Sequence, residues 1–232
     1  MTDADLDHLA LLELVQRELH ATIGLVPAGT PVPSCGRWTV TELVDHLAAI
    51  HHWAAAMARG HDEEPLERGS VPLDEHYARC AHEVAATLAA LGPDAPGRTL
   101  EGPGPASFWR RRQLHETLVH LWDLRTAGGL GVEAAPEVWA DTVDEVVHVM
   151  QPRQVRLRRM PALDVAVDLT ALDAGREWRL GPGGVAARVA VAGSAESLAL
   201  LLWGRRTPGG PHLAVAGDAA ALDRVLAQPL VP

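Results

Sequence analysis

The sequence predicts an α+β protein of two domains, an N-terminal four-helix bundle followed by a small α+β domain. Apolar residues recur at helical spacing through the first two thirds of the 232-residue chain. After Pro152 the pattern changes to alternating apolar and polar residues, as in residues 164–171, which is typical of strands. No internal repeat or low-complexity segment interrupts either part. We therefore expect domains at residues 1–152 and 160–232, with the arginine-rich residues 153–159 as the linker.

The helices expected in the first domain each carry an apolar stripe, and most have a capping or helix-breaking residue at one end. The clearest start is a capping box, in which Thr39 is followed three residues later by Glu42. Gly92 marks the end of one helix, and Pro136 marks the first turn of another. The expected helices are residues 6–23, 39–59, 74–91, 107–127 and 136–150. Such an up-down bundle can hold a metal ion between facing helices.

The second domain is expected to mix short strands with two helices. The strands are predicted at residues 164–171, 177–180, 186–191 and 212–215. Ser194 caps a helix that runs to Trp203, and a last helix covers residues 219–228. This order of strands and helices is typical of an α+β module.

Composition excludes several classes of function. The chain has no lysine, which excludes a Schiff-base mechanism and the lysine grip of a P-loop. A net charge of -10 argues against nucleic acid as a partner, because a protein that binds phosphates needs a basic face. Two cysteines are too few for a disulfide framework, and no apolar run has the length of a membrane span. Its arginine-, alanine- and glycine-rich usage indicates a high-GC genome. We expect a cytoplasmic, monomeric enzyme with a small-molecule substrate and no membrane partner.

A metal-ligand pattern stands out in the fourth predicted helix. Glu116 and His120 are four residues apart, so a helix presents both side chains on one face. His115 lies five residues before His120 and should point away from that face. Residues 115–120 form the motif HExxxH, which is one residue longer than the HExxH motif of zinc proteases. This spacing excludes that class of enzyme. A carboxylate and an imidazole remain, and they suit zinc or a similar divalent ion if a third ligand comes from another helix.

The best third ligand is His46, on the second predicted helix. His46 lies between Leu43 and Ile50 on the apolar stripe, so it should face the interior. Taken alone, His46 is better explained as a hydrogen-bonded core histidine. A carboxylate inside a bundle is costly unless it is paired or bound to a metal, which makes a shared site with Glu116 the better explanation. His51 and His52 lie at less regular positions and are expected at the rim or in solvent.

Several motifs of the chain resemble those of the mycothiol-dependent maleylpyruvate isomerase family, whose N-terminal module is a DinB-like four-helix bundle. The resemblance covers nearly the whole chain, and the order and spacing of its motifs are more specific than any one of them. It rests on residues 33–40 with His46 eight residues beyond Trp38, on residues 109–123, and on residues 152–153, 173–178, 202–206 and 216–218.

The resemblance implies a zinc ion held by two histidines and one glutamate, which correspond here to His46, Glu116 and His120. It also implies mycothiol, a low-molecular-weight thiol, as cosubstrate. Arg205 or Arg206, from the second domain, is implied to bind an acidic substrate, although each taken singly is better explained as a surface arginine.

Four further residues are expected to support the site. Arg112 lies four residues before Glu116 and either orients its carboxylate or a substrate, or forms a structural pair. Asp45 and Asp123 are candidates to accept the second N–H of a ligand histidine, and the alternative for each is an ordinary surface acid. Trp53 is expected to line the cavity, or else to belong to the core.

Three functions are compatible with these residues. The favoured one is a metal-dependent thiol transferase or cis-trans isomerase, because a three-ligand site leaves a position open for a thiol, which loses its proton there. The second is a lyase, hydrolase or cyclase that uses the metal as a Lewis acid without a thiol. The third is a non-catalytic ligand-binding protein with the same fold. The sequence leaves open the electrophilic substrate and the choice among Zn, Ni, Co and Fe.

Overall fold

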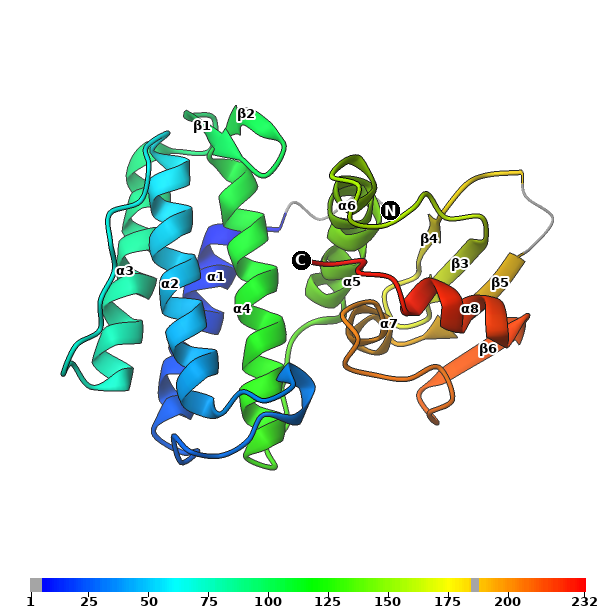
Figure 1. Ribbon diagram of the computed structural model, residues 1–232, viewed down its shortest axis with the longest axis horizontal. Helices are drawn as coiled ribbons and strands as arrows, with labels where there is room; N and C mark the ends of the chain where they lie inside the picture. The colour runs from blue at the N-terminus through cyan, green and yellow to red at the C-terminus, as the bar shows by residue number, and fades with distance from the viewer. Residues whose placement is uncertain (1–5, 185–187) are drawn as a thin grey trace. The chain divides into compact units, whose positions relative to one another are not determined.

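The computed structural model describes residues 6–184 and 188–232, and its polypeptide divides into two compact units, residues 1–132 and 133–232. The first unit is helical, and the second combines helices with a four-stranded sheet (Figure 1). The predicted fold class is therefore confirmed. No helix in the described ranges combines the length and the apolar character that crossing a bilayer requires.

Four long helices form the bundle of the first unit: α1 (His8–Ile23), α2 (Val40–Ala58), α3 (Leu73–Leu91) and α4 (Ser107–Ala127). Helix α2 packs against α3 and α4, and α1 packs against α3 and α4, so each helix has two neighbours (Figure 1). Fully buried leucines such as Leu12, Leu47, Leu88 and Leu118 fill the space between them. Burial of these side chains provides most of the free energy that holds the helices together.

Local signals fix the ends of these helices as expected. The capping box is present, since the Thr39 backbone N–H donates to Glu42 Oε2 at 2.8 Å at the start of α2. At the end of α3, Gly92 has φ of 75°, a left-handed conformation that glycine adopts without strain. The bounds of α4 are those predicted.

The segment between α3 and α4, where the sequence predicted neither helix nor strand, contains a short hairpin, β1 (Pro96–Thr99) and β2 (Gly102–Pro105). Proline and glycine dominate it, so sequence periodicity gave no strand signal. Tertiary contacts stabilise the hairpin instead. The Trp109 indole N–H donates to the Arg98 carbonyl at 2.7 Å, and a Cβ at Gly97 would approach the Ala58 carbonyl oxygen to 2.5 Å.

The helix expected at residues 136–150 is longer than predicted and lies in the second unit. It comprises α5 (Pro136–Glu145), a π-helical turn η2 (Val146–Met150) and α6 (Gln151–Arg156). Pro152 was expected to end it, but proline is tolerated in the first turn of α6, directly after the wider π turn. Helix α5 packs against α7, and Asp144 accepts a hydrogen bond from the Trp178 indole at 3.0 Å. The compact units thus divide after Val132, whereas the sequence placed the division between residues 152 and 160.

The sheet of the second unit has the order β4-β3-β5-β6, with β3 parallel to β5 and the outer pairs antiparallel. All four strands were predicted, but residues 186 and 187 of the third prediction lie outside the described residues. The Ser194 side chain accepts from the Ser197 N–H and caps the first helix of the sheet region, as expected. The elements are β3 (Ala166–Ala171), β4 (Arg176–Leu180), β5 (Arg188–Gly193), α7 (Ala195–Leu202), β6 (Leu213–Gly217) and α8 (Ala219–Leu226).

Candidate metal centre

Helices α2 and α4 bring together three side chains whose ligand atoms all lie within 4.8 Å of one another: His46, Glu116 and His120. His46 comes from the middle of α2, while Glu116 and His120 lie one turn apart on α4. The Nε2 atoms of the two histidines lie 3.4 and 3.3 Å from Glu116 Oε1. The two imidazoles therefore converge on one carboxylate oxygen.

These separations fit a divalent ion held by nitrogen and oxygen. Donor atoms bound to a tetrahedral zinc ion at about 2.0–2.2 Å lie roughly 3.4 Å apart. The two Nε2 to Oε1 distances match that spacing, so little movement would be needed to admit such an ion. Two imidazoles and one carboxylate also form a donor set that zinc accepts, and the set leaves a fourth position open.

Glu116 is held in its charged form by its neighbours. Burial raises the pKa of its carboxyl, but the Arg112 guanidinium and hydrogen bonds with His120 and His46 outweigh that effect, so the pKa lies well below its usual range. Arg112 is buried and bonds Glu116 Oε2. Since Arg112 occupies one carboxylate oxygen, the other is left to face the histidines.

The second ring nitrogen of His120 is engaged by buried Asp123. His120 Nδ1 lies 2.9 Å from Asp123 Oδ2, the arrangement by which a carboxylate fixes the tautomer and orientation of a ligand histidine. The Cys35 thiol donates to the same oxygen at 3.3 Å. Burial lowers the pKa of His120, but hydrogen bonds to Asp123, Cys35 and Glu116 outweigh it, so the pKa lies well above its usual range.

Cys35, His120 and Asp123 form a second group with metal-ligand spacing. The cysteine and the histidine each place a donor on Asp123 Oδ2, so the buried carboxylate is satisfied without a cation. The group around Glu116 is the better metal site, because its two imidazole nitrogens face an anionic oxygen.

One side of the centre is open to solvent. The His46 side chain is 31% exposed, while that of His120 is 6% exposed. The indole ring of Trp38 lies against the His46 ring, with 4.9 Å between centroids. A small molecule can therefore approach on the His46 side, beside an aromatic surface.

Sequence reasoning did not select Trp38 or Cys35 as site residues. Both belong to the segment between α1 and α2, which includes the short 3-10 helix η1 (Pro33–Cys35) and contacts α4. Both residues belong to a motif of the family resemblance, residues 33–40, but no pattern in the sequence assigned either of them a role at the site. Their place beside α4 depends on a contact between segments 88 residues apart, which no local pattern reports.

The remaining predicted site residues lie elsewhere. Asp45 forms an ion pair with Arg68 at 2.9 Å, because adjacent helical residues point about 100° apart and Asp45 does not share the face of His46. Trp53 packs edge-to-face on Trp109, with 5.0 Å between ring centroids. Both of these residues therefore make structural contacts.

Arg205 and Arg206 are engaged within the second unit. Arg206 pairs with Glu196 at 2.9 Å. The Arg205 guanidinium lies over the Trp203 ring, 5.8 Å from its centroid. Their suggested role in binding an acidic substrate stays a prediction.

The expectation that His51 lies at the rim was wrong. His51 is completely buried, and its Nδ1 lies 2.7 Å from Gln113 Oε1 on α4. Its position four residues after Leu47 continues the buried stripe of α2, which is wider than the stripe drawn from the sequence. His52 does lie on the outer side, where it contacts Glu83 Oε2 at 2.7 Å. Burial lowers the pKa of His51 to about 4, so that its ring is neutral at pH 7.

Comparison with known proteins matches each of the two units to a domain of one protein family. Residues 16–125 match the mycothiol maleylpyruvate isomerase N-terminal domain, and residues 137–224 match the MDMPI C-terminal domain. The uncharacterized proteins Rv0738 and MT0763 of Mycobacterium tuberculosis, from strains H37Rv and CDC 1551, are 30% identical over 116 residues. That match spans 47% of this chain and 59% of each relative, so this chain covers less than two thirds of their length.

Two crystal structures share the fold. One is of the mycothiol-dependent maleylpyruvate isomerase, with a TM-score of 0.67 and 18% identity. The other is of a histidine-to-alanine mutant, with a TM-score of 0.68 and 17% identity. Both comparisons cover 94% of this chain and 97% of the other. At this identity, the similarity concerns the fold.

Proposed function

Since the chain belongs to the mycothiol maleylpyruvate isomerase family, as its two matched domains show, we propose that it is a metal-dependent enzyme that uses mycothiol to isomerise or conjugate a small electrophilic acid. The observation that carries the proposal is the convergence of two imidazole nitrogens on one oxygen of Glu116, inside the family's N-terminal domain. Two imidazole nitrogens and a carboxylate oxygen at this spacing form a donor set that a divalent cation would complete.

His46, Glu116 and His120 would hold the ion, and zinc suits these donors best among the common divalent metals. When bound there, zinc would act as a Lewis acid that lowers the pKa of a thiol placed beside it. The thiol would then be present as the thiolate, which is a stronger nucleophile than the protonated thiol.

The surrounding residues position these ligands. Arg112 holds one oxygen of Glu116 and so directs the other toward the two histidines. Asp123 holds Nδ1 of His120 and leaves Nε2 as the ligand atom. Trp38 borders the exposed edge of His46, where it offers an apolar surface to a substrate.

The proposed chemistry begins with formation of a bond between the thiol sulfur and an electrophilic carbon of the substrate. If the carbon belongs to a conjugated double bond, addition allows rotation, and elimination of the thiol then restores the double bond as the other isomer. If the carbon carries a leaving group, its loss gives a thiol conjugate. Both routes balance without an oxidant or reductant, and the same residues support either.

The test is elemental analysis of the purified protein and of three variants, His46→Ala, Glu116→Ala and His120→Ala, followed by calorimetric titration with mycothiol. We expect one metal ion per wild-type chain, its loss from all three variants, and mycothiol binding that requires the metal. His52→Ala is the matched control, because His52 lies on the same helix but pairs with Glu83 at the surface, and it should keep both properties.

Two results would contradict the proposal. Metal without mycothiol binding would exclude the thiol-dependent reaction and favour Lewis-acid chemistry at the same site. Absence of metal from protein purified under metal-replete conditions would exclude both enzymatic readings.

A further inference from the structure

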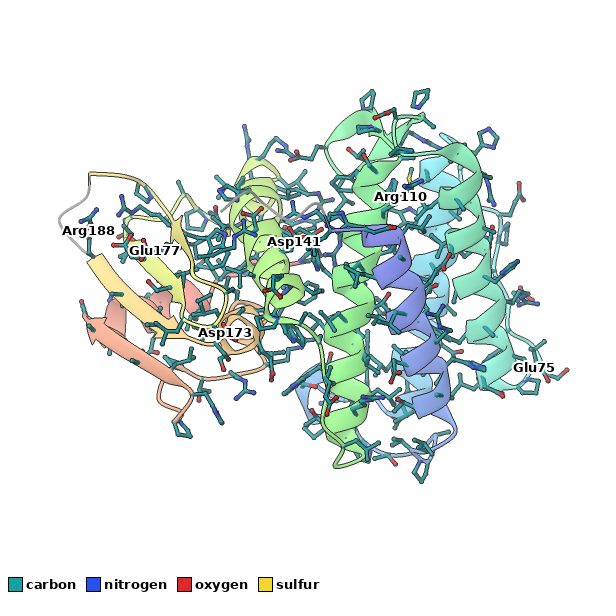
Figure 2. The ribbon with its side chains drawn as sticks, turned by 180° about the vertical axis from the view of Figure 1, so that it is seen from behind. Glu75, Arg110, Asp141, Asp173, Glu177 and Arg188 are labelled. Atoms are coloured by element: carbon teal, nitrogen blue, oxygen red, sulfur yellow. The ribbon has the colours of Figure 1, made fainter. Side chains whose placement is uncertain are left out.

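A second pocket lies in the first unit between α1 and α3, with a volume of about 300 Å³. Figure 2 shows this face of the bundle, on which α1 lies between α4 and α3. The candidate metal centre lies between α2 and α4, the other pair of helices, so the two sites share no residue. A volume of this size falls at the small end of ligand pockets in proteins.

Tyr77, one of the residues that line the pocket, has a buried hydroxyl without a hydrogen-bond partner among the described residues. The residue as a whole is completely buried. Buried polar groups of this kind are rare in folded proteins, since leaving one unsatisfied costs about 1–3 kcal/mol. A hydrogen-bond acceptor on a bound ligand would remove that cost.

Basic side chains predominate at the rim. Arg17 and His20 of α1 and His82 of α3 are exposed there, and none of them contacts another described residue through a hydrogen bond or ion pair. Within the described lining, Glu13 is the only acid. The guanidinium of an arginine matches the planar fork of a carboxylate, so an anion with that geometry is favoured over a cation.

Small apolar residues form one wall. Ala78, Ala81 and Ala85 follow one another along α3, and two of them are buried. Their methyl groups leave room and offer an apolar surface to the carbon skeleton of a ligand. An anionic group at the rim and an apolar body against α3 together describe a small organic acid.

One lining residue, Gln16, belongs to a buried chain of hydrogen-bonded side chains. Its Nε2 lies 3.4 Å from His51 Nε2, while His51 Nδ1 lies 2.7 Å from Gln113 Oε1. Because the Gln113 oxygen accepts, Nδ1 carries the proton of the neutral ring and Nε2 accepts from the Gln16 amide. The Gln16 amide group is thereby oriented before any ligand arrives, which lowers the entropy cost of binding.

We propose that the pocket between α1 and α3 is a second ligand site, which takes a small organic carboxylate. Arg17 pairs with the carboxylate, the Tyr77 hydroxyl donates a hydrogen bond to the ligand, and the alanine wall holds its apolar part.

The test is titration of the metal-loaded full chain with benzoate, followed by backbone amide signals in NMR spectra. We expect saturable shifts at Ala78 and Ala81, and a dissociation constant that rises roughly tenfold in Tyr77→Phe and in Arg17→Gln. Tyr77→Phe keeps the ring and removes only the hydroxyl, so the fold is preserved. Arg188→Gln, which removes an exposed arginine of the second unit, should leave benzoate affinity unchanged (Figure 2).

Further ligands and a metal-site variant separate the other outcomes. Binding should persist in His120→Ala, because the pocket is independent of the metal centre. Benzamide has the shape of benzoate without its charge and should bind at least about tenfold more weakly. The proposal is overturned if benzamide or inorganic phosphate binds as well as benzoate, if Tyr77→Phe and Arg17→Gln bind it normally, or if no signal of α3 moves because water alone fills the pocket.

Discussion

Two polar clusters lie about one helical turn apart along α2 and α4, the second with a residue of α1 as well, and they differ in charge. The metal cluster, His46, Glu116 and His120, contains a carboxylate and is neighboured by the charged groups of Arg112 and Asp123. The neutral cluster, Gln16, His51 and Gln113, joins two amides through a neutral imidazole. Amides and an imidazole satisfy one another by hydrogen bonds alone, whereas buried charges require counter-ions. The difference supports the proposal that the charged cluster holds a cation, and it suggests that the neutral cluster belongs to the scaffold.

The largest effect is expected from Glu116→Ala. This change removes the carboxylate that the buried Arg112 guanidinium bonds, so we expect the free energy of unfolding of the metal-free protein to fall by about 3–5 kcal/mol. Urea unfolding in the presence of a chelator measures it. The control is Glu83→Ala, which breaks partly exposed pairs with His52 and Arg59 and should cost less than about 1 kcal/mol.

An equal cost for the two glutamate variants would show that the charges around Glu116 are well solvated. The contrast between the charged and the neutral cluster would then not explain the metal site.

His51→Leu tests the neutral cluster. The variant leaves Gln113 Oε1 without its donor in a buried position, and we expect a loss of about 2–3 kcal/mol in the free energy of unfolding. Metal affinity should stay within roughly twofold of wild type, because His51 is neutral and its hydrogen bonds go to Gln16 and Gln113 rather than to the three ligands. Unfolding in urea and competition with a chelating dye measure the two quantities. Loss of metal from this variant would show that the clusters act as one unit.

Asp123→Asn separates the support of the metal cluster from its ligands. Asparagine keeps the shape of the aspartate side chain but accepts a weaker hydrogen bond from His120 Nδ1. We therefore expect metal affinity to fall about 10–100-fold. Cys35→Ala is the matched comparison, since it removes the other donor to the same oxygen, and it should cost less than tenfold. A sulfur-to-metal absorption band in the cobalt-loaded protein that disappears in Cys35→Ala would instead place the ion at Cys35, His120 and Asp123.

Local signals in the sequence accounted for most of the helices. The bounds of α4 and the capping box of α2 depend on residues adjacent in the chain, so both were predicted correctly. The hairpin β1–β2 was missed because its stability comes from contacts with Trp109 and the end of α2. Continuation of the helix through Pro152 depends on a π turn, which has no recognised sequence signal.

The site residues also divide into those that local spacing predicts and those that only the folded chain brings together. The spacing of Glu116 and His120 is a property of one helix, and the structure brings His46 to them from the predicted apolar stripe. Asp45 pairs with Arg68, and burial of a helix face could not tell in advance which neighbour this adjacent residue meets. Cys35 reaches Asp123 only through folding of a distant loop, which the sequence pattern does not encode.

His52, the third histidine of this part of α2, provides a surface reference for the two clusters. Burial lowers its pKa, but hydrogen bonds with Glu83 and the Glu64 carbonyl outweigh that effect, so the pKa is raised. A raised pKa means that the stabilisation is complete below the unfolded value of about 6.5 and is lost as pH rises through the folded value. The Glu83 pKa is lowered despite burial, chiefly by His52 and Arg59, so its share is lost only under more acidic conditions. We therefore expect His52→Gln to destabilise the protein by less than about 1 kcal/mol near pH 5.5, and by less still near pH 8. Urea unfolding at both pH values measures the difference, and a cost that grows with pH would mean that His52 stabilises the fold through its neutral form, as His51 does.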